Sequence, residues 1–544
     1  MKKIFRSLGL LTLAGAALFT ASSCSVFGET YYYKYDSETK GYAVTGLKNF
    51  SGKTSIEIPS KHKNKKVTKI ADDAFNGWDL LTKVKLPSTL KVIGNDAFNG
   101  CKSVKKFNVP KNVTEIGDNA FANCALLEEV TLPESLNYFG DYVFKNDNKL
   151  NLGEASGDAV YYNNILIKLT SAGKEKTSIT VQEGTKCINS GAFIGSNATS
   201  ITLPETVTTI CGDAFVRYDK EEQNAPETDL NLTTNVNIPN SLIQVGNNTF
   251  EGFEQLESIS LSSDKDIRIK DSSFKNCTNL KTVTITGDVS VDCNAFVGSG
   301  VESLVVTGDL EFLEPASDSE TRSSNSAFLN VTSLKSVTVS EDVVIGTNTF
   351  KGCTSLATLA ISKATIIEKG AFEGCTALTA VELPETLEVL GNGAFKDCTG
   401  LTTATIKESD LKAIGDGNST SADFGVFEGC TSLATVNLNK NIKNINYKSF
   451  SGCTALATVS GVDNVEVLAG SSFENCTSLA SFSASNKLNI VGAKAFAGCT
   501  SLATFNFSGS LKNWENVVVA DNAFENAAVT AVTCSDGNAT INKA

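Results

Sequence analysis

The sequence predicts a strand-rich solenoid of α/β type, in which about 18 short units stack on one another. A phenylalanine recurs along most of the 544 residues, usually at steps of 22 to 24. Glycines, and in many units a proline, recur at fixed distances from these phenylalanines. With 41% hydrophobic and 20% charged residues, the chain has the composition of a folded protein rather than a disordered one.

The repeat is clearest in neighbouring segments. KVIGNDAFNGCKSVKKFNVP (91–110) matches TEIGDNAFANCALLEEVTLP (114–133), and IIEKGAFEGCTALTAVELP (366–384) matches NIVGAKAFAGCTSLATFNFS (489–508). The marker phenylalanines lie at 75, 98, 121, 144, 193, 215, 250, 274, 296, 328, 350, 372, 395, 427, 450, 473, 496 and 524. Longer steps predict loop insertions near 219–234, 311–326 and 407–423.

Each unit has a physical interpretation. After Phe98, apolar residues alternate up to Val109, which predicts a short strand with one buried face. Pro110 ends the strand, because proline cannot donate to a ladder. A second extended piece then leads to a glycine such as Gly117, where a tight turn is expected to need a positive φ. Stacking such units predicts a leucine-rich repeat with a parallel sheet along one wall.

The unit LxxVxLPxxLxxIGxxAFxxC resembles the BspA-like leucine-rich repeat family of bacterial surface proteins, from about Tyr31 to Cys534. TYYYKYDSETKGYAVTGL resembles the N-terminal cap hairpin of that family. AVYYNNILIKLTSAGKEKTSITV (159–181) resembles its hairpin interruptions, which implies such an interruption near 150–185. The resemblance implies adhesion to host matrix proteins or to other cells, and no enzymatic activity. We therefore expect a cap at 25–58, the solenoid at 59–534 and a C-terminal tail at 535–544.

The first residues have the pattern of an export signal. A basic start, Lys2, Lys3 and Arg6, precedes an apolar run from Leu8 to Phe19. Ala21-Ser22-Ser23-Cys24 follows and resembles a lipobox, which would make 1–24 a lipoprotein signal and Cys24 the lipid attachment site. Ordinary cleavage near Ser23 is the alternative. The expected location is the bacterial cell surface or outer membrane, with the exported chain held by its lipid.

Ten cysteines follow a marker phenylalanine by three residues. Stacking would place neighbouring cysteines about 5 Å apart, within reach of a disulfide or a shared metal. Other units, however, have Trp78, Phe253, Val331 or Ala527 at this position. Exchange with apolar residues indicates a packing position filled by free thiols, so no metal site is predicted.

The strand residues that point away from the core form the candidate binding surface. Near the N-terminus this surface is basic, and farther along it consists of hydroxyls and amides, which are also ordinary residues for an exposed strand face. The candidate residues are Lys83, Lys85, Lys106, Thr403, Thr405, Thr435, Asn437, Thr458, Thr504 and Asn506.

The N-terminal region has two further features. Residues 29–111 contain sixteen lysines and eight acidic residues, and the densest run is KHKNKK at 61–66. This run could meet anionic lipid, glycan or acidic protein, or it could be a solvated loop. Tyrosines at 31, 32, 33, 35 and 42 could form a contact patch, or they could cover the first layer of the core.

Composition excludes several function classes. A single histidine, His62, argues against histidine-based catalysis, and a net charge of −13 argues against nucleic-acid binding. No phosphate-binding loop, nucleophile elbow or zinc spacing occurs, so no catalytic residue and no cofactor is predicted. The leading hypothesis is a monomeric adhesin of the cell surface, whose partners are host or neighbouring-cell surface proteins, including extracellular matrix. The alternatives are a self-associating envelope protein without a dedicated ligand and, remotely, a hydrolase.

Overall fold

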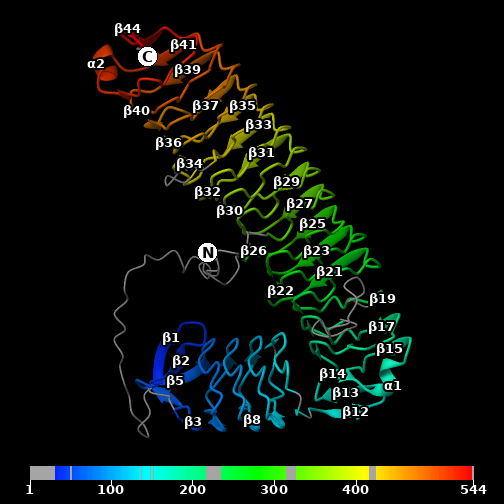
Figure 1. Cartoon of the computed structure of the whole chain (residues 1–544). Coiled ribbons are helices and arrows are strands. Elements are labelled where there is room, and N and C mark those ends of the chain that lie inside the picture. The colour runs from blue at the N-terminus through cyan, green and yellow to red at the C-terminus, as the bar shows by residue number, and fades with distance from the viewer. Residues whose placement is uncertain are drawn as a thin grey trace. The chain divides into compact units, whose positions relative to one another are not determined.

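The computed structural model describes residues 31–48, 52–136, 138–147, 149–150, 152–215, 235–313, 326–415 and 424–541. The chain divides into two compact units, Met1–Leu152 and Gly153–Ala544. In each unit, short strands of successive turns stack into parallel ladders (Figure 1). The strand-rich solenoid expected from the repeat is therefore confirmed.

The first unit begins with an antiparallel hairpin, β1 (Tyr31–Asp36) and β2 (Gly41–Leu47). β2 continues into a parallel ladder, whose members are β5 (Lys65–Ile70), β7 (Val92–Ile93), β9 (Glu115–Ile116) and β11 (Tyr138–Phe139). β4 (Lys61–His62) pairs with β5 in the antiparallel sense. The other wall of this unit has two strand pairs, β3 (Ser55–Glu57) with β6 (Lys83–Lys85), and β8 (Lys106–Asn108) with β10 (Glu129–Thr131).

The second unit also begins with antiparallel strands, β12 (Glu154–Ser156), β13 (Ala159–Tyr162) and β14 (Ile165–Leu169). From β14 a parallel ladder runs through β16 (Cys187–Ile188), β18 (Thr209–Ile210), β20 (Gln244–Val245), β22 (Ile267–Ile269), β24 (Val289–Val291), β26 (Leu310–Phe312), β28 (Val343–Ile345), β30 (Ala364–Ile367) and β32 (Val389–Leu390). A further ladder comprises β34 (Ala413–Ile414), β36 (Asn444–Ile445), β38 (Val467–Leu468), β40 (Ile490–Val491) and β42 (Val518–Val519).

The other wall of the second unit carries the strands that follow each marker phenylalanine. In order they are β15 (Ser178–Thr180), β17 (Ser200–Thr202), β19 (Asn235–Val236), β21 (Ser258–Ser262), β23 (Thr282–Thr286), β25 (Ser303–Val306), β27 (Ser336–Val339), β29 (Thr358–Ala360), β31 (Ala380–Leu383), β33 (Thr403–Ile406), β35 (Thr435–Asn437), β37 (Thr458–Ser460), β39 (Ser481–Ala484), β41 (Thr504–Phe507) and β43 (Ala531–Cys534). We call these strands, together with β3, β6, β8 and β10, the candidate wall. The described residues contain two helices, α1 (Ser171–Lys174) and α2 (Leu511–Trp514).

The marker phenylalanines form the core of both units. Phe350 and Phe372, for example, are fully buried, with ring centroids 5.4 Å apart and planes 9° from parallel. This spacing approaches the distance between neighbouring strands, so each ring lies on the ring of the next turn. One unit could not bury such a ring alone, and stacking therefore makes the core continuous within each unit.

Glycine recurs in the turn for a different structural reason from the one expected. Gly117 does not have a positive φ, because the left-handed residue of that turn is Asn119, with φ of 53°. A Cβ at Gly117 would instead lie 2.6 Å from the backbone nitrogen of Asn95 in the preceding turn. Glycine is required here by the close approach of two backbones, while Asn119 takes the left-handed conformation, which asparagine tolerates.

The other boundaries also differ in part from expectation. The expected tail contains β44 (Gly537–Thr540), which pairs antiparallel with β43. The second extended piece of each turn forms a parallel ladder of its own, in addition to the one wall predicted. The expected insertions lie largely outside the described residues, as do the signal segment and Cys24. Among the helices that are described, none is long and apolar enough to cross a membrane.

Candidate binding surface

The outward residues of the candidate wall are aligned from turn to turn. In β33, Ala404 and Ile406 are buried, whereas Thr403 and Thr405 point outward and are half-buried. The ladder places Thr403 beside Thr435, and Thr435 beside Thr458. The structure therefore places five of the predicted C-terminal candidates in two parallel rows across β33, β35 and β37. Thr504 and Asn506 lie on β41, in a separate sheet.

The second of these rows is joined by side-chain hydrogen bonds. Asn437 donates from Nδ2 to Oγ1 of Thr405 at 3.2 Å, and Ser460 donates from Oγ to Oδ1 of Asn437 at 2.9 Å. On β41, Asn506 donates from Nδ2 to Oγ of Ser483 at 3.3 Å. Such bonds reduce the rotamer freedom of the row, so a partner would meet donors and acceptors that are already oriented.

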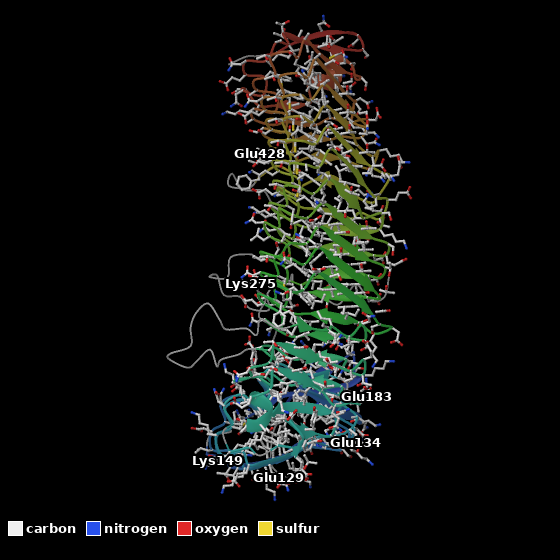
Figure 2. All side chains as sticks on the ribbon, turned by 90° about the vertical axis from the view of Figure 1, so that its right-hand side faces the viewer. Glu129, Glu134, Lys149, Glu183, Lys275 and Glu428 are labelled. Carbon is white, nitrogen blue, oxygen red and sulfur yellow. The ribbon has the colours of Figure 1, made fainter. Side chains whose placement is uncertain are left out.

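The basic candidates of the first unit are largely neutralised. Lys85 lies 2.6 Å from a carboxylate oxygen of Glu57, and Lys106 lies 2.6 Å from one of Glu129, which is marked in Figure 2. Both pairs join neighbouring strands in register, and all four side chains are substantially exposed. Exposed pairs of this kind contribute little to stability, about 0–1 kcal/mol. Lys83 remains an exposed cation on β6.

The sequence reasoning missed the middle of the candidate wall. β21 and β23 are each five residues long, and their outward positions are all hydroxyl residues. The alternation of SISLS and TVTIT was the available signal, because each has apolar residues at positions two and four. The additional outward residues are Ser258, Ser260, Ser262, Thr282, Thr284 and Thr286.

The ten cysteines that follow a marker phenylalanine by three residues are all buried. Cys453, for example, is fully buried, and its Sγ donates to the carbonyl oxygen of Phe427 in the preceding turn at 3.1 Å. Burial raises the pKa of the Cys353 thiol to about 12, so this group stays uncharged. The fourteen described cysteines are free, and no cluster suitable for a metal ion occurs among the described residues. This burial agrees with the packing interpretation.

In many turns the residue directly after the marker phenylalanine is charged, and these residues form a ladder of ion pairs between successive turns. Glu373 lies 2.8 Å from Lys351 and 3.5 Å from Lys396, and the Glu373 side chain is 19% exposed. Lys275 and Glu428 belong to the same position of other turns and lie on the same flank of the second unit in Figure 2. Opposite charges alternate here because successive turns bring this position into proximity. The ladder is a structural feature of the repeat.

Comparison with known proteins identifies the family. The model of the BspA type leucine rich repeat region matches residues 46–155, 172–228, 228–317, 321–420 and 417–529, which is most of the chain. The chain belongs to this family. No curated protein was found to match the chain.

Several solved structures of bacterial leucine-rich repeat proteins are also similar to this chain. A leucine-rich repeat protein from Bacteroides ovatus has 23% identity and a TM-score of 0.28, with 77% of this chain and 95% of that chain covered. A leucine rich cell surface protein from Faecalibacterium prausnitzii has 18% identity and a TM-score of 0.24, with coverages of 90% and 96%.

Proposed function

We propose that this BspA-type protein is a lipid-anchored binding protein of the bacterial cell surface, which attaches to surface or matrix proteins of a host or of neighbouring cells. The observation that supports binding is the register-matched surface of the candidate wall, where rows of hydroxyls and amides cross successive strands. The proposal contains no catalytic step. Its partners are macromolecules, because the rows extend over many turns.

The binding mode follows from the residue types of the rows. Threonine, serine and asparagine give modest contacts, and tryptophan and arginine, which dominate many interfaces, are absent from the rows that we have described. Affinity should therefore accumulate over several turns instead of residing in one residue. Removing turns stepwise, with both ends capped, is expected to weaken binding gradually.

The test compares two double variants in the same two turns. Ser481→Arg with Thr504→Arg places two bulky cations on the outer face of β39 and β41, where these residues are neighbours in register. Ser478→Arg with Ser501→Arg adds the same groups at exposed positions just before these strands. The probes are immobilised matrix proteins and intact host cells. We expect only the first variant to lose binding, by at least tenfold.

Two results would contradict this proposal. Equal loss of binding in both variants would show that the outer face has no special role. Binding that tolerates every change on the candidate wall, but disappears when the insertion near 219–234 is shortened, would assign recognition to that loop. Thermal unfolding of each variant controls for damage to the fold.

The anchor is tested separately by Cys24→Ser. We expect this variant to leave the membrane fraction, whereas the wild-type chain should carry lipid mass on its mature N-terminus.

A further inference from the structure

The start of the first unit gathers positive charge. Residues 31–70 contain nine lysines against three acidic residues. The β4–β5 hairpin places Lys61 opposite Lys66 and His62 opposite Lys65. Its turn residues, Lys63 and Asn64, have φ angles of 47° and 63°, which are typical of a tight two-residue turn. We call residues 61–66 the lysine hairpin.

The lysines of this hairpin differ from those of the candidate wall. Lys61, Lys63, Lys65 and Lys66 are all exposed, and no carboxylate oxygen of the described residues lies within 4.0 Å of their ammonium groups. Lys85, by contrast, is paired with Glu57 in the ladder. The lysine hairpin is therefore a local concentration of like charge that carboxylates of the described residues do not pair with.

Aromatic contacts hold the hairpin against the first two strands. His62 is buried, its ring stacks on Tyr33 with centroids 3.9 Å apart, and it meets Tyr42 edge-on at 4.8 Å. Beside them, Tyr35 is 46% exposed, and Nζ of Lys65 lies 4.3 Å from the centre of its ring. An exposed tyrosine beside lysines is a combination suited to the boundary between lipid headgroups and acyl chains.

We propose that the lysine hairpin and Tyr35 lie against a membrane surface rich in anionic phospholipid. The inference extends the proposed anchor at Cys24. Six residues separate Cys24 from Tyr31, so the seven Cα–Cα steps of this tether span at most about 25 Å. Tyr35 is four residues farther along β1, roughly 14 Å away. The tether therefore keeps the hairpin within reach of the bilayer, where each lysine strengthens attachment about fivefold.

Flotation with vesicles tests the surface independently of the lipid. The exported chain with Cys24→Ser, which lacks the anchor, is mixed with phosphatidylcholine vesicles that contain or lack phosphatidylglycerol. We expect it to float only with the anionic vesicles and only at low salt, because screening acts within about 10 Å at 0.1 M salt. Changing the four lysines at 61, 63, 65 and 66 to glutamate should reduce flotation at least tenfold.

A matched control changes four other exposed lysines, at 176, 186, 265 and 512, to glutamate, which alters the net charge equally. We expect this control variant to keep most of its binding. A second measurement needs no substitution: on anionic vesicles, acetylation of the hairpin lysines in the wild-type chain should slow several-fold relative to Lys512. Equal loss in both variants, or unchanged acetylation, would overturn the proposal.

The outcomes separate this inference from the anchor. If the wild-type chain fails to float with neutral vesicles, the anchor is wrong, while the Cys24→Ser chain on anionic vesicles still reports on the hairpin. If the wild type floats with both vesicles but the Cys24→Ser chain with neither, the anchor stands and the hairpin surface is wrong. Binding of the hairpin lysines to a soluble anionic polysaccharide, without binding to vesicles, would also overturn the proposal.

Discussion

We expect Asp147 to make the stability of the first unit sensitive to pH. It follows Phe144 by three residues, at the position that is cysteine in the two preceding turns. Its side chain is buried, and Oδ1 accepts a hydrogen bond from the backbone N–H of Cys124 at 2.7 Å. Oδ2 makes no hydrogen bond with the described residues. Burial raises the pKa of Asp147 to about 8, although the N–H of Cys124 partly opposes this.

The sign of the effect follows from proton linkage. The unfolded carboxyl has an ordinary pKa near 3.8, so between about pH 4 and pH 8 the folded state holds a proton that the unfolded state has lost. The contribution of Asp147 to the free energy of unfolding is therefore greatest below about pH 4 and is lost as the pH rises to about 8. The full difference in pKa would correspond to roughly 6 kcal/mol, but the turn that contains Asp147 can open locally to hydrate the carboxylate. We expect a measured loss of about 1–3 kcal/mol.

The assay uses the two tryptophans, since Trp78 lies in the first unit and Trp514 in the second. Trp514→Phe leaves Trp78 as the fluorescent reporter of the first unit during urea unfolding. Asp147→Asn on that background retains an oxygen acceptor for Cys124 and removes the titration. We expect the reference to lose stability from pH 5 to pH 8.5 and the Asn variant to lose much less.

The titration of His62 also contributes to the pH dependence that this assay measures. Burial, followed by the charge of Lys63, lowers its pKa, so His62 contributes stability that is lost as the pH falls below about 6.5. Its sign is opposite to that of Asp147, and comparing the two variants cancels it. Parallel pH profiles for the Asp147 reference and the Asn variant would refute the reasoning.

Three further predictions concern the repeat. Native thiols should resist alkylation until the chain unfolds, and rapid labelling or several disulfides in the intact mass would contradict this. Cys453→Ser should lower the free energy of unfolding by at most about 1 kcal/mol, because a hydroxyl can donate to the carbonyl oxygen of Phe427 as the thiol does. Cys453→Ala, which removes this donor, should lower it by about 1–2 kcal/mol. Urea unfolding with Trp514 as reporter measures both. Glu373→Gln should lower the free energy of unfolding by about 1 kcal/mol, less at high salt, since it weakens pairs with Lys351 and Lys396.

The fold was predictable because its signals are local and repeated. The alternation after Phe98 sets one strand, and its recurrence sets the ladder, so even register followed from aligning segments. The role of Gly117 was not predictable, because a need for positive φ and a close backbone approach favour the same residue. The division near Leu152 also had no clear signal beyond the expected interruption at 150–185.

The sequence predicted which residues of the candidate surface point outward, but it did not predict the ion pairs that these residues form. Outward positions follow from the period of two, which placed Thr403 and Thr435 correctly in one row. Whether Lys85 and Lys106 are available depends on partners 28 residues earlier and 23 residues later, since Glu57 and Glu129 stand beside them. A charge count over the segment could not show that pairing.

The distribution of charge in the ladders explains why the lysine hairpin is exceptional. In-register stacking brings equivalent side chains of successive turns to roughly 5 Å, where like charges repel. Several charged rows therefore alternate in sign, as Lys281, Glu302 and Lys335 do. Neutral rows such as Thr405, Asn437 and Ser460 need no such alternation and can extend by hydrogen bonding. The four hairpin lysines follow neither pattern, and for this reason an external anion is the counter-charge we infer for them.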